Sequence, residues 1–261
     1  MVGLDATLEG EEGDTGNEYG SGDKPNLNLP GLQPDIIRIA KESGKPVIVV
    51  LLAGSAMALS WEDEHVDAIL DGFYPGAQGG AAIAEILFGG ANPEGKLPIT
   101  FYQTTEELPE FTDYAMKGRT YRYMENEALY PFGYGLSYTT YAYGNLECVK
   151  PFDAQDGITL QVTVTNTGDR EGTETLQVYV KAKREGTPNP QLKYVKKITL
   201  KPGESVTEEI HLSPEAFMLY DEKGNFTLEK GAYDIFVGGC QPDARSAALT
   251  GNAPQKLTVT Y

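Results

Sequence analysis

The sequence is poor in the residues that usually build metal centres and disulfide frameworks. Its 261 residues include two cysteines, Cys148 and Cys240, and two histidines. The cysteines are far apart in the chain and form no Cys-x-x-Cys pair, and two histidines are too few to complete a zinc site with them. We therefore expect no metal and no cofactor. We expect both thiols to be free and buried rather than joined in a disulfide.

Basic residues and long apolar runs are also scarce. Twenty-one Lys and Arg face 38 Asp and Glu, which gives a formal net charge of −17. Because like charges repel, this balance argues against nucleic acid or a membrane as a partner. The longest apolar run, residues 47–53, has the length of a strand and not of a membrane span. The first residues lack a signal-peptide pattern, so localisation stays unknown, and it is cytoplasmic only if the start at Met1 is genuine.

The acidic excess is confined to one half of the chain. Residues 1–143 carry 22 acidic and 8 basic residues, whereas residues 144–261 carry 16 and 13. Such an asymmetry indicates two domains. We place the boundary after residue 143, with an α/β domain before it and an all-β domain after it.

The first domain shows a helix and strand pattern typical of a mainly parallel sheet. The expected elements are helices at residues 33–43 and 79–88 and strands at residues 46–53, 66–70 and 97–101. The continuous apolar run of residues 46–53 is typical of a strand buried on both faces of a parallel sheet. Residues 1–5 read as the end of another buried strand, so we expect this domain to be N-terminally incomplete.

Residues 101–143 form an aromatic connector between the two domains. This stretch holds 12 of the 26 aromatic residues. The favoured interpretation is an irregular segment packed between domains, because tyrosine often anchors such interfaces. A sugar-stacking surface is the alternative, since aromatic faces suit pyranose rings.

The second domain consists of short segments in which apolar and polar residues alternate. The expected strands are residues 158–164, 175–180, 196–200, 205–212, 231–237 and 257–261. Six or seven such strands in about a hundred residues indicate a β-sandwich of immunoglobulin-like type. Nothing in this half resembles a catalytic constellation, and His211 is a lone histidine in the middle of a strand.

Residues 7–18, TLEGEEGDTGNE, contain five carboxylates and no base. A calcium loop starting at Glu9 would need an acidic residue at its twelfth position, which is Gly20. A solvated loop is the simplest reading on composition. However, the stretch follows an apolar strand end, and α/β folds place their sites at that edge of the sheet. Crowding by neighbouring carboxylates would raise the pKa of one of them, as a general acid requires.

Several motifs of the chain occur together in one known family. They are LDATLEGEEG at residues 4–13, NLPGLQ at 28–33, YPGAQGG at 74–80, NPEGKLPITF at 92–101, YAMKGRTYRY at 114–123 and YPFGYGLSY at 130–138. In this order they resemble the C-terminal part of glycoside hydrolase family 3. The remainder is similar to the fibronectin type III-like domain that often follows it, with PGES at residues 202–205 and GAYDI at 231–235 as matching motifs.

The resemblance implies a retaining β-glycosidase that hydrolyses O-glycosidic bonds at non-reducing ends. Its expected partners are a β-linked oligosaccharide or aryl glycoside and an N-terminal barrel domain. In this family an Asp on the barrel is the nucleophile, and a Glu from a loop of the α/β sandwich is the acid/base. Retention requires the two carboxyl groups about 5–5.5 Å apart. The chain therefore reads as a partial α/β sandwich followed by the fibronectin-like domain.

The match to the acid/base motif indicates Glu11 first, Glu12 second and Glu9 third. The motif usually continues from its Glu to an Asp-Arg pair. Here Asp14 has the expected spacing from Glu11, but Thr15 stands where the Arg is expected. Residues 22–24, GDK, also resemble the end of the motif, as if the loop carried an insertion.

The barrel and its nucleophile have no counterpart in these residues. We expect the chain alone to be inactive, because no covalent intermediate can form without the nucleophile. The residues within these motifs, such as LEGEE and AMKGRTYRY, resemble a β-xylosidase more than a β-glucosidase. A non-catalytic carbohydrate-binding or structural module and one subunit of a split enzyme are the alternatives.

Overall fold

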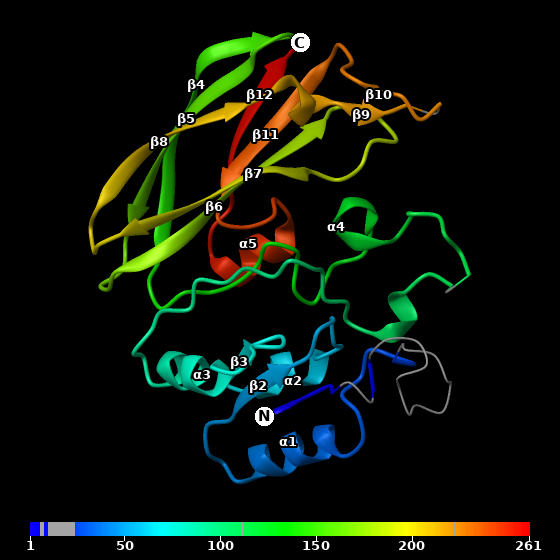
Figure 1. Cartoon of the computed structure of the whole chain (residues 1–261), viewed down its shortest axis with the longest axis vertical. Coiled ribbons are helices and arrows are strands. Elements are labelled where there is room, and N and C mark those ends of the chain that lie inside the picture. Colours follow the sequence, from blue (N-terminus) through cyan, green and yellow to red (C-terminus); the bar gives the residue numbers. More distant parts are fainter. Residues whose placement is uncertain (6–7, 10–23, 111, 222) are drawn as a thin grey trace. The chain divides into compact units, whose positions relative to one another are not determined.

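The structure is a computed structural model that describes residues 1–5, 8–9, 24–110, 112–221 and 223–261 (Figure 1). Two units make up the chain, and both are discontinuous in sequence. Unit 1 comprises Met1–Ala91, Ile99–Gly118 and Asn126–Tyr130, and unit 2 comprises Asn92–Pro98, Arg119–Glu125 and Pro131–Tyr261. The domain boundary after residue 143 remains a proposal. Among the described residues, none of the helices has the length and apolar character that crossing a bilayer requires.

Unit 1 contains a three-stranded parallel sheet in the order β1-β2-β3. The strands are β1 (Val2–Gly3), β2 (Ile48–Leu52) and β3 (Ala68–Asp71). In the central strand Val49, Val50 and Leu51 are buried, because β2 has a neighbour on each side. The strand expected at residues 46–53 is therefore present, with the bounds Ile48–Leu52.

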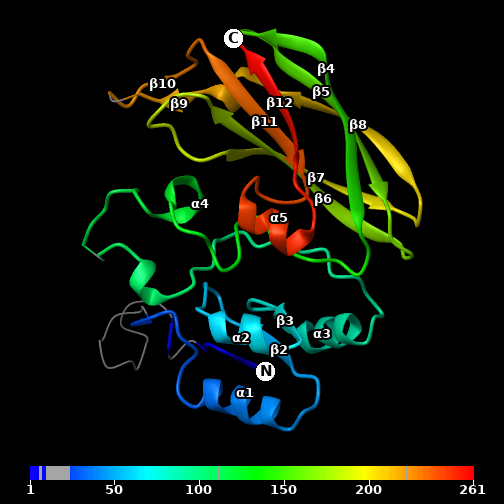
Figure 2. The same ribbon diagram turned by 180° about the vertical axis from the view of Figure 1, so that it is seen from behind.

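Three α-helices accompany this sheet. They are α1 (Gln33–Glu42), α2 (Ser60–His65) and α3 (Gly79–Leu87). Helix α1 lies along one face of the sheet in both views (Figures 1 and 2) and buries Ile37. It has Pro34 in its first turn, and Gly44 follows it at φ 70°. Both residues are ordinary signals for the start and stop of a helix.

The strand expected at residues 97–101 is wrong. In place of a strand, Phe101 forms an isolated antiparallel bridge to Tyr130. Phe101 is fully buried, and its ring is tilted against that of Tyr130 at a centroid distance of 5.9 Å. The apolar run marks burial of Phe101 and not a ladder, since Pro98 removes one of the donors that a ladder needs.

Unit 2 contains two open antiparallel sheets. One has the order β4-β5-β8 and the other the order β12-β11-β6-β7. The first sheet consists of β4 (Tyr141–Asp153), β5 (Gly157–Asn166) and β8 (Ser205–Leu212). The second consists of β6 (Gly172–Ala182), β7 (Gln191–Leu200), β11 (Ala232–Gly238) and β12 (Gln255–Thr260). All six strands expected from the alternation are present.

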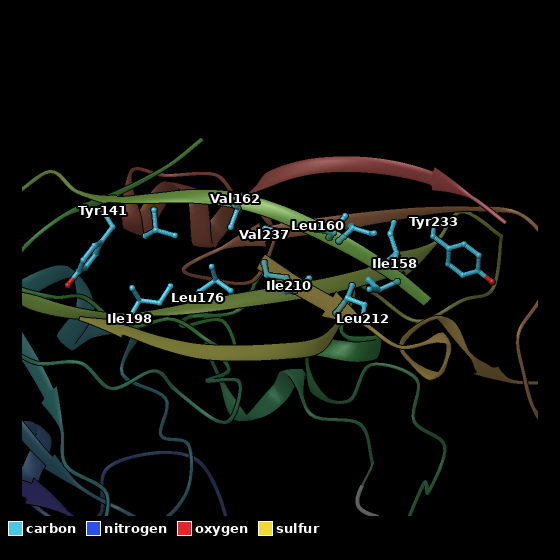
Figure 3. Close-up of a cluster of buried hydrophobic side chains, with 14 of the residues drawn as sticks. Tyr141, Ile158, Leu160, Val162, Leu176, Ile198, Ile210, Leu212, Tyr233 and Val237 are labelled. Atoms are coloured by element: carbon cyan, nitrogen blue, oxygen red, sulfur yellow. The ribbon is translucent and has the colours of Figure 1, made fainter. Parts of the chain in front are cut away.

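One apolar core is shared by both sheets of unit 2. Strand β5 buries Ile158, Leu160, Val162 and Val164 at alternate positions. The second sheet contributes further aliphatic side chains at the same period of two: Leu176, Val178, Val180, Ile235 and Val237. Figure 3 shows Tyr141 at one end of this cluster and Tyr233 at the other.

Several elements had no clear pattern in the sequence. They are the hairpin β9 (Leu219–Tyr220) and β10 (Phe226–Thr227), the short helices η1 (Thr105–Glu107), η2 (Pro214–Phe217) and α4 (Thr120–Tyr123), and α5 (Ala244–Thr250). Helix α5 carries local signals that could have revealed it. Asp243 caps its first turn by accepting a bond from the Ser246 N–H at 2.7 Å, and Gly251 ends it in the left-handed conformation.

The two cysteines differ in environment. Both are free, as expected. Cys240 is buried, but Cys148 is exposed on β4, so the expectation of two buried thiols is wrong for Cys148. Its strand pairs with β5 through repeated register shifts, and residues 147–151 are all exposed.

Candidate functional site

The carboxyl edge of the parallel sheet collects the segments that follow its three strands. Leu4 and Asp5 follow β1, residues 53–56 follow β2, and residues 72–74 follow β3. Because the strands are parallel, these segments meet at the same edge. This is the edge at which the acidic stretch was expected.

Gly3 allows β1 to pair closely with β2 at this edge. It has φ 144°, and a Cβ at this position would overlap the carbonyl of Leu52. On the other side of β1, the side chain of Gln33 at the start of α1 pairs with the backbone of Gly3. Its Oε1 accepts from the Gly3 N–H at 2.7 Å, and its Nε2 donates to the Gly3 carbonyl at 2.9 Å. The amide of Gln33 thus makes the two bonds that a further strand would make here.

Glu9 and Lys24 meet at Ser55 beyond the end of β2. Lys24 Nζ donates to Ser55 Oγ at 2.7 Å and to the Ala56 carbonyl at 2.5 Å, and it lies 3.3 Å from Met57 Sδ. Ser55 Oγ donates in turn to Glu9 Oε2 at 2.6 Å. Burial lowers the pKa of Lys24, and the nearby charge of Glu9 partly opposes this effect. The result is a relay of ammonium, hydroxyl and carboxylate.

This relay bears on the three glutamates indicated by the sequence. Glu11 and Glu12 lie outside the residues that the structure describes, so their ranking stays a prediction. Glu9 is engaged as a hydrogen-bond acceptor from Ser55, which suits a positioning group better than a proton donor. Lys24 lies at the end of the GDK match, and no other sequence signal pointed to Lys24 or Ser55.

Asp71 is a second carboxylate at this edge that the sequence patterns did not single out. Its Oδ1 accepts from the Phe73 N–H at 3.0 Å. Its Oδ2 is buried and has no hydrogen-bond partner among the described residues. Burial raises the pKa of Asp71. Its position directly after the apolar run of residues 66–70 was the signal that could have found it.

Tyr74 provides an exposed aromatic surface near the relay. Its side chain is 56% exposed, and its ring packs over Gly54, where an added Cβ would lie 2.5 Å from Tyr74 Cε2. Gly54 directly precedes Ser55, so the Tyr74 ring covers the loop that carries the hydroxyl of the relay. A glycine here lets a ring lie flat against the backbone.

The aromatic connector packs on the β-sandwich through three aromatic rings, two of which are stacked. Tyr121 and Phe132 stack at a centroid distance of 4.2 Å, and both meet the edge of Tyr179 on β6. Gln177 Nε2 donates to the carbonyl of Gly133 at 2.9 Å. For these residues the favoured interpretation of the connector, structural packing, agrees with their contacts.

Two further sequence observations can be located. His211 lies within β8, where its Nδ1 is 3.4 Å from Thr159 Oγ1. Within the described parts of the chain, no group of three or more His, Cys, Asp or Glu side chains could hold a metal ion.

Two family models match the chain. Residues 1–138 match the glycosyl hydrolase family 3 C-terminal domain, and residues 174–241 match the fibronectin type III-like domain. The two matched regions include all of the α/β pattern and the centre of the β-sandwich.

Curated relatives agree with these models. The chain is 41% identical over 253 residues to a xylan 1,4-beta-xylosidase of Xylanibacter ruminicola, covering 95% of the chain and 29% of that protein. It is 38% identical over 238 residues to a periplasmic beta-glucosidase of Salmonella typhimurium, covering 85% of the chain and 31% of that protein. The chain thus spans about a third of the length of these relatives.

Solved structures show the same relationship. A β-glucosidase from Erythrobacter marinus superimposes with a TM-score of 0.82 and 32% identity, covering 99% of the chain and 33% of that protein. A beta-glucosidase from Listeria innocua in complex with glucose gives a TM-score of 0.78 and 29% identity, covering 94% and 35%.

Proposed function

The chain belongs to glycosyl hydrolase family 3, whose C-terminal domain it carries, and from this premise we propose that it works as the C-terminal part of a retaining β-glycosidase. Its substrates would be β-linked xylosides or glucosides, cleaved at their non-reducing ends. The β-xyloside is the favoured substrate, because the motif wording points to it and the 41% identical relative is a xylan 1,4-beta-xylosidase.

The chain would supply the acid/base, and a barrel domain would supply the nucleophile. In the first step the acid/base donates a proton to the leaving oxygen while the nucleophile attacks the anomeric carbon. In the second step the same carboxylate removes a proton from water, which displaces the nucleophile. Glu11 is the first candidate for this role and Glu12 the second.

The observation that carries this proposal is the convergence of Glu9 and Lys24 on Ser55. These two residues stand immediately before and after residues 10–23, and both bond to one hydroxyl at the carboxyl edge of the sheet. The segment that contains Glu11 and Glu12 therefore leaves and returns at the edge where α/β folds bind ligands. Asp71 ends the neighbouring strand β3 and Tyr74 follows it, and they could contribute a carboxyl group and a stacking surface for a sugar.

The proposal is tested with a polypeptide that includes the barrel. Glu11→Gln, Glu12→Gln and Glu9→Gln are compared by kcat/KM on xylobiose and on an aryl β-xyloside with a good leaving group. Loss of a general acid costs about 10²–10⁴-fold where the leaving group needs protonation. We expect the kcat/KM of Glu11→Gln to fall by this factor on xylobiose and to change little on the aryl β-xyloside. Added azide should raise the turnover of the aryl β-xyloside by this variant.

Four results would contradict or change this proposal. Full activity of Glu11→Gln on xylobiose would show that Glu11 is not the acid/base. If Glu12→Gln instead showed the losses expected for Glu11→Gln, the role would belong to Glu12. Hydrolysis by the 261-residue chain alone would mean that a nucleophile lies within it. Xylo-oligosaccharide binding by this chain without hydrolysis in any barrel-containing polypeptide would favour a carbohydrate-binding module.

A further inference from the structure

We propose that a cavity at one end of the β-sandwich binds a neutral, polyhydroxylated small molecule of monosaccharide size. All the described residues that line the cavity belong to unit 2. Its polar lining includes residues from the segment before the connector, from the connector itself, from β4 and β6, and from the segment after α5: Lys96, Ser137, Tyr141, Tyr143, Glu174 and Asn252. Its volume is about 110 Å³. One water needs about 10–15 Å³ on this scale, so several waters or one small organic molecule fit.

The charges that line the cavity cancel each other. The side chains of Glu174 and Lys96 are 6% and 15% exposed, and Lys96 Nζ lies 3.9 Å from Glu174 Oε1. Tyr143 donates to the same oxygen at 2.9 Å, and Lys96 also donates to the Gly135 carbonyl at 2.7 Å. The ammonium of Lys96 would repel a cationic ligand, and the carboxylate of Glu174 would repel an anionic ligand. The cavity therefore favours a neutral ligand.

Two polar atoms of this site have hydrogen-bonding capacity left for a ligand. Tyr141 is 6% exposed, and its hydroxyl has no partner with regular hydrogen-bond geometry among the described residues, although the Ser137 side chain lies near it. Figure 3 shows this hydroxyl at the end of the aliphatic cluster, directed away from it. Both contacts of Glu174 fall on Oε1, and no bond to Oε2 is present in the described part of the chain. A buried hydroxyl in a native protein almost always has a partner, which a bound molecule would supply for Tyr141, and Glu174 Oε2 has an acceptor site left for the same molecule.

Neighbouring hydroxyl groups on one small molecule match this pair of atoms. One hydroxyl can donate to Glu174 Oε2 while another accepts from the Tyr141 hydroxyl. The rings of Tyr141 and Tyr143 line the same cavity and offer apolar contact to C–H groups. Carboxylate, phenol and aromatic ring together are the chemistry that recognises a sugar or another polyol.

The test uses the full chain and D-xylose, with cyclohexanol as a ring of similar size and a single hydroxyl. Saturation-transfer NMR reports direct contact, and thermal unfolding reports stabilisation. Because sugars also stabilise proteins by exclusion from the surface, the readout is the difference between the parent and Tyr141→Phe. This variant removes only the unpartnered hydroxyl, so we expect it to fold and to melt above the parent without ligand. Tyr138→Phe, which changes an exposed tyrosine of the connector, is the matched control.

We expect xylose to give saturation transfer and a higher Tm with the parent and with Tyr138→Phe. Tyr141→Phe should weaken xylose binding at least about tenfold, the loss of one buried hydrogen bond, and Glu174→Gln should weaken it further. Cyclohexanol should not compete. Equal xylose effects in the parent and in Tyr141→Phe would overturn the proposal, and so would absence of transfer, which would mean that the cavity holds water only. Neither outcome involves hydrolysis, so failure here is distinct from failure of the proposed activity.

Discussion

Glu174 is the residue at which burial and charge oppose each other most directly. Burial raises its pKa, and the charge of Lys96 and the hydrogen bond from Tyr143 offset part of this rise. The folded protein therefore holds this proton more tightly than the unfolded chain does. Unfolding releases it in the window that begins near the ordinary value of 4.5 and extends to the raised pKa.

Stability should fall as the pH rises through this window, by about 1.4 kcal/mol for each unit by which the pKa is raised. Glu174→Gln mimics the protonated acid and lacks this dependence. The free energy of unfolding of this variant, relative to the parent, should therefore improve from about pH 4 to about pH 7. Urea unfolding at a series of pH values measures this difference. Exposed Glu171→Gln is the control and should follow the parent, and parallel curves for Glu174→Gln would contradict the prediction.

At the same scale, the site was only partly visible in the sequence. The carboxyl edge was predictable because an apolar run followed by polar residues marks a strand end. Ser55 and Asp71 were not, since single Ser and Asp residues occur in many loops and their meaning depends on burial. The Tyr141–Glu174 cavity combines residues that are 33 positions apart with Lys96, and no local spacing indicates such a set.

At the scale of elements, the connector is held on β6 by a backbone that only glycine can supply. Gly133 has φ 78°, and an added Cβ would overlap Gln177 Oε1 and lie 2.6 Å from the Tyr179 hydroxyl. Those two side chains bond to each other at 2.6 Å, and Gln177 also bonds to Gly133. A methyl group here would therefore disturb the stacked rings as well as the turn.

We expect Gly133→Ala to lower the free energy of unfolding of the β-sandwich by more than about 2 kcal/mol. The left-handed conformation alone costs about 1–2 kcal/mol with a Cβ, and each displaced hydrogen bond adds about 0.5–1.5 kcal/mol. Gly186→Ala is the matched control, because Gly186 has φ 73° but no heavy atom within 4 Å of an added Cβ. Equal losses in the two variants, measured by urea unfolding, would show that the contact with Gln177 is unimportant.

Elements with a clear period were predicted well, and elements held by distant contacts were not. The alternation in β5 and β8 matched the strands because each has one face in the core. Helix α2, SWEDEH, is short and mostly polar, so it has no period to detect. Strand β4 pairs with β5 through several register shifts, which break the alternation along its length.

At the scale of the whole molecule, the two units have separate apolar interiors. The cluster around Leu160 contains residues of the β-sandwich alone, whereas Leu51 is buried in the parallel sheet of unit 1. Loss of a buried leucine side chain costs about 2–5 kcal/mol through lost burial and the remaining cavity. Each substitution should therefore lower the stability of the unit that contains the residue.

We expect differential scanning calorimetry to resolve two transitions in the chain. Leu160→Ala should lower the Tm of one transition, and Leu51→Ala should lower the Tm of the other. Both leucines are fully buried, so each variant serves as the control for its counterpart. A single transition lowered by either substitution would mean that the units unfold together.

The interleaving of the two units limits how such a protein can be rearranged by recombination. The chain passes from one unit to the other five times, and residues 92–98 belong to the β-sandwich unit although unit 1 sequence follows them. A transplant that began at Pro131 would carry Glu174 into its new host and leave Lys96 behind. A buried carboxylate would then be inherited without its cation. A transplanted β-sandwich would therefore keep the charge of Glu174 neutralised only if residues 92–98, which contain Lys96, were transferred with it.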